Sequence, residues 1–167
     1  MTKLNNKARL AAALLLIALS GCSTFRQPSP GTPLADVTSR LGKPNAVYAD
    51  PDGSQWLEYR GQPMGQFQHM AHVGADGRLI SYEQVLTSEN FARVKVNDWT
   101  RDQVLRNFGQ PAEKSRDRAT GDEVWSYRYK QDNVWNSFLN IYFNARGIVL
   151  KVENAADPLL DDRFKGL

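Results

Sequence analysis

Apolar residues along this chain follow two periods, one typical of helices and one typical of strands. Leu34, Val37 and Leu41 recur every three or four residues, which places them on one face of a helix. Residues 137–144, SFLNIYFN, instead alternate between core-forming and polar or amphipathic side chains, as in a half-buried strand. The sequence therefore predicts a mixture of short amphipathic helices and strands.

The helical pattern occurs twice and ends in the same way. Residues 32–44 read TPLADVTSRLGKP, and residues 100–111 read TRDQVLRNFGQP. Four pairs of positions match at a constant offset of 67: Val37 with Val104, Leu41 with Phe108, Gly42 with Gly109, and Pro44 with Pro111. The glycines suit the left-handed turn that ends a helix, and the prolines prevent its continuation. The match predicts an internal repeat.

Polar residues at the start of each helix are typical of helix caps. We expect Thr32 to cap the first helix. Thr100 and Gln103 form a T-x-x-Q capping box for the second. A further short helix is predicted at about 88–94, capped by Thr87 and leading into the second copy.

Each copy of the helix is followed by segments with the composition of strands and by turns rich in glycine and aspartate. The predicted strands are 45–49, 55–60, 66–73 and 78–85 in the first copy, and 112–118, 124–129, 137–144 and 148–154 in the second. The expected fold class is therefore α+β. Two tandem repeats, 32–85 and 86–154, each place a helix before an antiparallel β-meander and together form one sheet-and-helix domain.

The N-terminus has the three parts of a secretory signal. Lys3, Lys7 and Arg9 make a positive start, residues 10–19 are wholly apolar, and small residues follow. This apolar run is too short for a transmembrane helix, which needs about 20 residues. A helix of the protein core would carry polar residues on one face, so we expect residues 1–21 to be a signal peptide.

The only cysteine, Cys22, follows this segment directly. A single cysteine cannot form an internal disulfide, and a thiolate zinc site needs further ligands nearby. Leu19, Ser20, Gly21 and Cys22 resemble the lipobox of bacterial lipoproteins. In that class the cysteine receives a diacylglyceryl group, the signal is cut before it, and the new amine is acylated. Because one acyl chain anchors only marginally and several anchor stably, we expect Cys22 to hold the protein on a membrane.

Residues 22–31 are predicted to be the lipidated N-terminus and a flexible tether, because prolines favour extended chain here. Ser23, rather than an aspartate, follows the anchor. By resemblance to lipoprotein sorting in Gram-negative bacteria, this favours the outer membrane, with the domain facing the periplasm. Residues 155–167 are expected to form a solvated C-terminal tail, which contains Asp157, Asp161 and Asp162.

Cleavage before Cys22 changes the charge. Removing residues 1–21 from 167 leaves 146, and Lys plus Arg falls by three from 21 to 18, which equals the 18 Asp plus Glu. The mature chain is close to neutral although the whole chain has a pI near 9.1. No basic domain remains to favour nucleic acid. About 146 residues are enough for one compact domain without disulfides.

The helix ending in Gly-x-Pro, the strand rich in Trp and Tyr (QWLEYR, VWSYRY), and the hairpin with a Gly turn resemble the SmpA/OmlA (BamE-like) family of outer-membrane lipoproteins. The resemblance covers residues 32–85 and 86–154, and the lipobox agrees with it. Two tandem copies also resemble the fold of the β-lactamase inhibitor protein. The resemblance implies protein partners, which would include subunits of the machinery that inserts β-barrel proteins into the outer membrane.

Little in the sequence indicates catalysis. His69 and His72 are the only histidines, and on a strand they point to opposite faces, so they cannot chelate one metal together. No G-x-S-x-G, H-E-x-x-H or phosphate-binding glycine loop occurs. Trp135 lies in a polar turn, where an aromatic residue is typical of a contact site. We therefore expect no catalytic, metal or cofactor-binding residues.

Three functions remain open. The first is a lipid-anchored, periplasm-facing module of the outer membrane that binds protein partners, as an accessory factor in β-barrel assembly or in envelope integrity. The second is an envelope lipoprotein that binds or inhibits a periplasmic enzyme, and the third is an enzyme. In the first two functions, the protein contacts the membrane through its lipid and binds other proteins. Neither nucleic acid nor a small-molecule substrate is expected.

Overall fold

The computed structural model describes residues 27–160, which form two similar successions of elements. The first is helix α2 (Leu34–Leu41) followed by β1 (Ala46–Ala49), β2 (Gln55–Arg60), β3 (Gln68–Val73) and β4 (Leu79–Gln84). The second is α3 (Ser88–Phe91) and α4 (Arg101–Phe108) followed by β5 (Glu113–Arg116), β6 (Glu123–Gln131), β7 (Trp135–Phe143) and β8 (Val149–Ala156). All the strands expected from the alternation are present at nearly the expected bounds.

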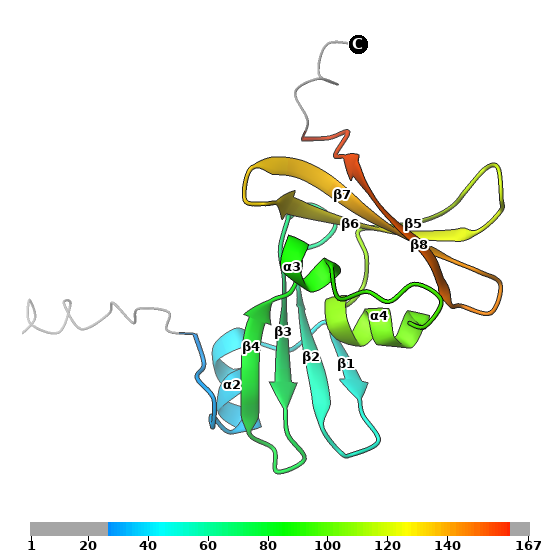
Figure 1. The fold of residues 1–167 in the computed structure, drawn as a ribbon. Helices are drawn as coiled ribbons and strands as arrows, with labels where there is room; N and C mark the ends of the chain where they lie inside the picture. Colours follow the sequence, from blue (N-terminus) through cyan, green and yellow to red (C-terminus); the bar gives the residue numbers. More distant parts are fainter. Residues whose placement is uncertain (1–26, 161–167) are drawn as a thin grey trace, which may run out of the picture.

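These strands form two four-stranded antiparallel sheets, ordered β1-β2-β3-β4 and β5-β6-β7-β8. Both are meanders, in which each strand pairs with the next along the chain. The fold class is α+β, as predicted from the sequence. The strands do not join into a single sheet, because α3 and α4 separate β4 from β5 and α4 lies between the two sheets (Figure 1).

Helix α4 supplies apolar side chains to a core that both sheets share. Val104 and Phe108 are fully buried, as the period of the sequence predicts. They belong to one buried cluster with Met70 of β3 and Tyr127 of β6. Phe91 of α3 closes this core, with its ring centroid 4.8 Å from that of Phe108. Burying one such large apolar side chain contributes about 1.5–3 kcal/mol, so α4 is the main connection between the sheets.

Helix α2 packs on the other face of the first sheet. Val37 is fully buried beside Leu57 of β2 and Ala71 of β3. Because successive residues of a strand point to opposite faces, Ala71 faces α2 while its neighbour Met70 faces α4. The first sheet is thus covered on both faces, whereas α4 covers the second sheet on one face (Figure 1).

The ends of α2 and α4 share the same local structure. Gly42 and Gly109, which follow the two helices, have positive φ angles of 81° and 69°, a conformation that favours glycine. Tyr59 of β2 donates a hydrogen bond to the Gly42 carbonyl at 3.4 Å, and Tyr127 of β6 donates one to the Gly109 carbonyl at 2.8 Å. Each helix end is therefore held by a tyrosine of its own sheet.

The pairing irregularities also occur in both halves. Isolated antiparallel bridges join Pro33 to Arg78 and Thr100 to Ile148. A register shift occurs between His72 and Val73 where β3 pairs with β4, and between Tyr142 and Phe143 where β7 pairs with β8. The chain before each helix thus returns to the last hairpin of its own sheet.

Two of the three predicted caps are confirmed. Thr87 accepts a hydrogen bond from the Asn90 N–H, and Thr100 with Gln103 forms a complete capping box. The prediction for Thr32 is wrong, because Pro33 is the N-cap residue of α2 and no side chain caps this helix. The Thr32 carbonyl instead accepts a hydrogen bond from the Leu79 N–H, so the backbone bridge to β4 decides where α2 begins.

Candidate protein-binding site

The C-terminal end of α4 is the point where the two sheets are locked together. A helix leaves its last carbonyls without partners inside the helix. Here the Gln68 amide of β3 donates to the carbonyls of Phe108 and Gln110, while Tyr127 of β6 donates to that of Gly109. Gln68 and Tyr127 are both fully buried, and burial raises the pKa of the Tyr127 hydroxyl. One side chain from each sheet therefore satisfies the same helix end.

Glu58 of β2 completes this lock with a buried carboxylate. It accepts hydrogen bonds from the Tyr48 hydroxyl at 2.5 Å, the Arg60 Nε at 2.6 Å and the Gln110 N–H at 3.1 Å. A Cβ added at Gly109 would lie 2.9 Å from Glu58 Oε2, so only glycine allows this approach. Buried carboxylates need such partners, and this one is fully engaged within the core.

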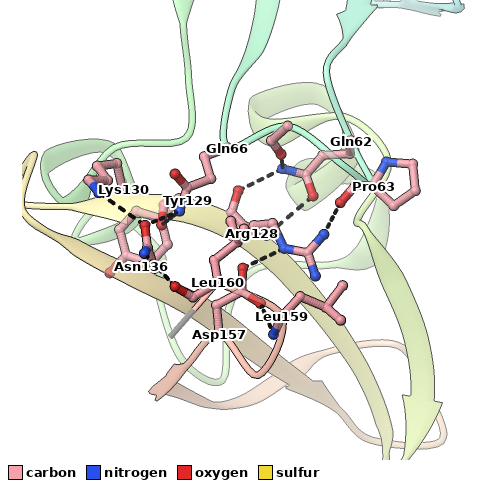
Figure 2. A network of polar contacts seen from close by, with 11 residues as sticks. Gln62, Pro63, Gln66, Arg128, Tyr129, Lys130, Asn136, Asp157, Leu159 and Leu160 are labelled. Carbon is pink, nitrogen blue, oxygen red and sulfur yellow. Dashed lines mark hydrogen bonds and ion pairs between the residues drawn. The ribbon is translucent and has the colours of Figure 1, made fainter. Parts of the chain in front are cut away.

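A second junction lies where the β2–β3 loop, residues 61–67, crosses β6 (Figure 2). β5 pairs only with residues 123–126 of β6, so the edge of β6 beyond them lacks a strand partner. The Gln62 side chain takes that place, because its Nε2 donates to the Arg128 carbonyl at 2.6 Å and its Oε1 accepts from the Arg128 N–H at 3.3 Å. The loop thus shields an edge that would otherwise be free to pair.

The Arg128 side chain forms a buried ion pair with Asp157, directly after β8 (Figure 2). Its Nε lies 2.5 Å from Asp157 Oδ2, its terminal nitrogen donates to the Pro63 carbonyl, and its side chain is 5% exposed. The expectation of a solvated tail from residue 155 is therefore wrong at this position. Asp157 is fully buried, and its carboxylate supplies the partner that the buried Arg128 guanidinium needs.

Gln66 and Asn136 extend the junction to the other side of β6 (Figure 2). Gln66 Nε2 lies 3.0 Å from Asn136 Oδ1, and Asn136 Nδ2 donates to the Leu160 carbonyl at 2.8 Å. Three segments are thus joined by hydrogen bonds: the β2–β3 loop, the start of β7, and residues 157–160. We call them the junction segments.

Large apolar side chains point outward from the junction segments and from the adjoining β6–β7 turn. Their exposed fractions are 76% for Met64, 60% for Val134, 66% for Trp135 and 60% for Leu159. We call these four residues the junction surface. Exposed aromatic and apolar residues on a rigid support are typical of protein contact sites. Trp135, singled out in the sequence for its polar turn, is indeed exposed at the start of β7.

A groove of about 400 Å³ opens on the α2 side of the first sheet. Its walls include the cations Lys43 and Arg60 and the rings of Tyr59, Phe67, His69 and Tyr82. The His69 and Tyr82 rings stack with centroids 5.0 Å apart. Partial burial lowers the pKa of His69 and raises the pKa values of both tyrosines, so the rings are neutral at neutral pH. We call this feature the aromatic groove.

The histidines lie on opposite faces of β3, as predicted. His69 stacks on Tyr82 on the side of α2, while His72 stacks on Trp56 with ring centroids 4.0 Å apart on the side of α4. Within residues 27–160, no group of three or more His, Cys, Asp or Glu side chains is placed to hold a metal ion.

The residues of the predicted lipid anchor, Leu19, Ser20, Gly21 and Cys22, lie outside the described residues. In the described part of the chain, no helix has both the length and the apolar character needed to cross a bilayer.

The sequence did not identify the residues that hold the junction. Gln62, Gln66, Arg128 and Asp157 come from three distant segments, and no local pattern marks them as partners. One signal was present in the sequence: Arg128 stands between Tyr127 and Tyr129, inside the apolar and aromatic pattern of a strand. In the structure β6 is buried on both faces at this position. A charged residue in such a strand requires a partner.

Comparisons with known proteins do not assign this chain to a family. No family model matches it, and no curated protein is significantly similar in sequence. Among solved structures, a DUF4309 family protein from Bacillus subtilis is similar over 74% of this chain and 77% of its own, at 14% identity and a TM-score of 0.34. A cysteine-rich secretory protein from Staphylococcus aureus is similar over 78% and 44%, at 14% identity and a TM-score of 0.28. Likeness at this level defines neither the fold family nor the function.

Proposed function

We propose that this protein is a lipid-anchored, periplasm-facing module of the outer membrane that binds other proteins. Cys22 carries the lipid, a tether follows it, and the folded part presents the binding surface. The predicted tether, residues 22–31, is too long at its C-terminal end, because Pro28 is buried and the Gly31 N–H donates to the Leu79 carbonyl at 2.7 Å. By its resemblance to SmpA/OmlA proteins, its role is that of an accessory factor in β-barrel assembly or envelope integrity. Anchoring confines partners to a thin layer, so that weak contacts suffice for binding.

The family resemblance implies that residues 32–85 and 86–154 are two copies of one unit. The features that the halves share support this part of the proposal. Both have a positive-φ glycine after the helix, a tyrosine hydrogen bond to that glycine, and a register shift before the last strand. Superposing the two halves on their Tyr59 and Tyr127 positions tests the relationship; unrelated paths of the two helices would refute it.

The observation that carries the proposed function is the junction surface. Its four side chains are 60–76% exposed, although each belongs to or adjoins a segment held by buried or partly buried hydrogen bonds. Pre-ordered apolar side chains lose little conformational freedom when a partner covers them. A partner that buries Trp135, which is 66% exposed, would gain the large apolar area typical of an interface anchor.

Site-specific photo-crosslinking in living cells tests this proposal. A photoreactive amino acid is placed at Trp135 or Met64, and at Ile80 as a control, because Ile80 is also an exposed apolar residue, at 50%, but lies at the start of β4 away from the junction. We expect adducts from Trp135 and Met64 that mass spectrometry identifies as barrel-assembly subunits. Adducts with one soluble periplasmic enzyme would instead support the second function, an inhibitor.

A genetic measurement complements the crosslinking. Deletion of the gene should sensitise cells to large antibiotics and detergents if the protein serves barrel assembly. A Trp135→Asp variant should fail to restore resistance, whereas Ile80→Asp at the same protein level should restore it. Restoration by both variants, with adducts at neither Trp135 nor Met64, would refute binding through the junction surface.

A further inference from the structure

The aromatic groove has a fixed aromatic wall. The rings of Tyr59 and Tyr82 meet edge to face with centroids 6.1 Å apart, Tyr82 stacks on His69, and Phe67 lies 5.9 Å from His69. Four rings therefore follow one another without interruption. Phe67 at the end of this row is 49% exposed, so one of its faces is open to a ligand.

The exposed Phe67 ring is held in place by two glycines of the β2–β3 loop. A Cβ on Gly61 would lie 2.7 Å from the Phe67 ring, and one on Gly65 would lie 3.0 Å from it. The backbone of the loop therefore lies directly against one face of the ring. Neighbouring Gln66 is tied to β7 through Asn136, which fixes the loop on its other side. An exposed aromatic ring with so little freedom is suited to binding.

The opposite edge of the groove is cationic. Lys43 and Arg60 lie near each other there, because Asn45, two residues after Lys43, accepts a hydrogen bond from the Arg60 N–H at 2.7 Å. Arg60 Nε is paired with Glu58, but within residues 27–160 its terminal nitrogens and the Lys43 amine make no hydrogen bond or ion pair. No Asp or Glu side chain lines the groove in the described part of the chain. The edge therefore favours an anionic ligand.

We infer that the aromatic groove binds an extended segment of a partner protein in which an aromatic residue stands next to carboxylates. The aromatic side chain lies against Phe67 and His69, and the neighbouring Asp or Glu side chains pair with Lys43 and Arg60. A neutral sugar would use the rings but leave the cations without a role. The groove shares the β2–β3 loop with the junction but none of its lining residues with the junction surface, so the inference goes beyond the proposed function and does not depend on it.

Selection from a displayed library of random dodecapeptides on the full-length, detergent-solubilised protein tests this inference. We expect the selected peptides to share an aromatic residue flanked by Asp or Glu. A synthetic peptide of that consensus should bind, and its dissociation constant should rise at least tenfold in Phe67→Ala and in Lys43→Glu. The matched controls Ile80→Ala and Lys95→Glu replace residues that are similarly exposed outside the groove, and they should bind as the parent does.

Thermal melting of each variant distinguishes loss of binding from loss of fold, because exposed residues such as Lys43 should leave the melting temperature unchanged. Binding of the consensus peptide should also weaken as the salt concentration rises. Any one of three results would overturn the inference: selection of no peptide, a consensus without acidic residues, or a dissociation constant in Phe67→Ala and Lys43→Glu equal to that of the parent. Binding of neutral oligosaccharides with the same dependence on Phe67 would assign the groove to a glycan. Peptide binding that appears only after removal of residues 161–167, which contain Asp-Asp-Arg-Phe, would assign it to this chain's own C-terminal segment.

Discussion

Replacing Asp157 by alanine should destabilise the protein strongly, although the residue lies in a segment that reads as a polar tail. The substitution removes the carboxylate 2.5 Å from Arg128 Nε and leaves the guanidinium, which is 5% exposed, inside the junction. Removing one partner of a buried ion pair costs about 3–5 kcal/mol, because the remaining charge is desolvated without compensation. Two contacts of Arg128 persist: the Pro63 carbonyl and the Phe138 ring, whose centroid lies 4.9 Å from Cζ. We therefore expect the lower end of this range, about 3 kcal/mol.

Urea unfolding of residues 23–167, followed by tryptophan fluorescence and far-ultraviolet circular dichroism, measures this loss. With a slope of about 2 kcal/mol per molar urea, the midpoint should fall by roughly 1.5 M. The corresponding fall in Tm is roughly 10 °C for a domain of this size. Glu153→Ala is the matched control, because Glu153 pairs with Lys151 at 2.8 Å on the exposed side of β8, and it should leave the midpoint unchanged.

The double variant Arg128→Met, Asp157→Leu separates the charge from the packing. It removes both ions together, so its loss should be smaller than that of Asp157→Ala alone. A midpoint for Asp157→Ala equal to that of Glu153→Ala would mean that Arg128 reaches water, and the view of the junction as a buried ionic connection would then be wrong. If the double variant were less stable than Asp157→Ala, the attraction between Arg128 and Asp157 would stabilise the protein. The loss in Asp157→Ala would then not come from an unpaired charge.

Four further outcomes are expected. Gly109→Ala should lower the free energy of unfolding by more than the roughly 1–2 kcal/mol cost of a left-handed backbone, because its Cβ would also clash with Gln68 Nε2. Tyr127→Phe, which removes only the hydrogen bond to this glycine, should cost about 1 kcal/mol in the same urea assay. Burial lowers the folded-state pKa of His69, so the unfolded chain binds its proton first as the pH falls below about 6.5; unfolding free energy should decrease from pH 7.5 to pH 5.5, and less so in His69→Phe. Cys22→Ser should abolish palmitate labelling and membrane retention, and labelling of that variant equal to the parent would refute the lipid anchor.

The local parts of the fold follow from the sequence because local patterns determine them. The positions of Val104 and Phe108 predict which face of α4 is buried, and both are fully buried. The capping box at Thr100 is equally local and is confirmed. Thr32 fails as a cap because the Thr32 backbone pairs with Leu79, 47 positions later, and no pattern near Thr32 records that contact.

The candidate sites were harder to predict than the strands. Trp135 could be singled out because an aromatic residue in a polar turn has no obvious place in a core. The partners Gln62, Arg128 and Asp157 could not be, since their hydrogen bonds join positions 29 and 66 residues apart. The arrangement of the strands in two sheets could not be predicted either. The alternation predicts each strand, but not whether β4 pairs with β5 in one sheet.

The position of α4 between the sheets also determines how the chain acquires its structure during synthesis. The first sheet is complete at Gln84, but its face with Met70 and Trp56 has no cover until α4 ends at Phe108. At about 5–20 residues per second, the intervening 24 residues (108 minus 84) take roughly 1–5 s to appear. For that time a formed sheet exposes an apolar face to solvent. A chaperone bound to this face would have to leave as α4 arrives, because helix and chaperone compete for the same side chains.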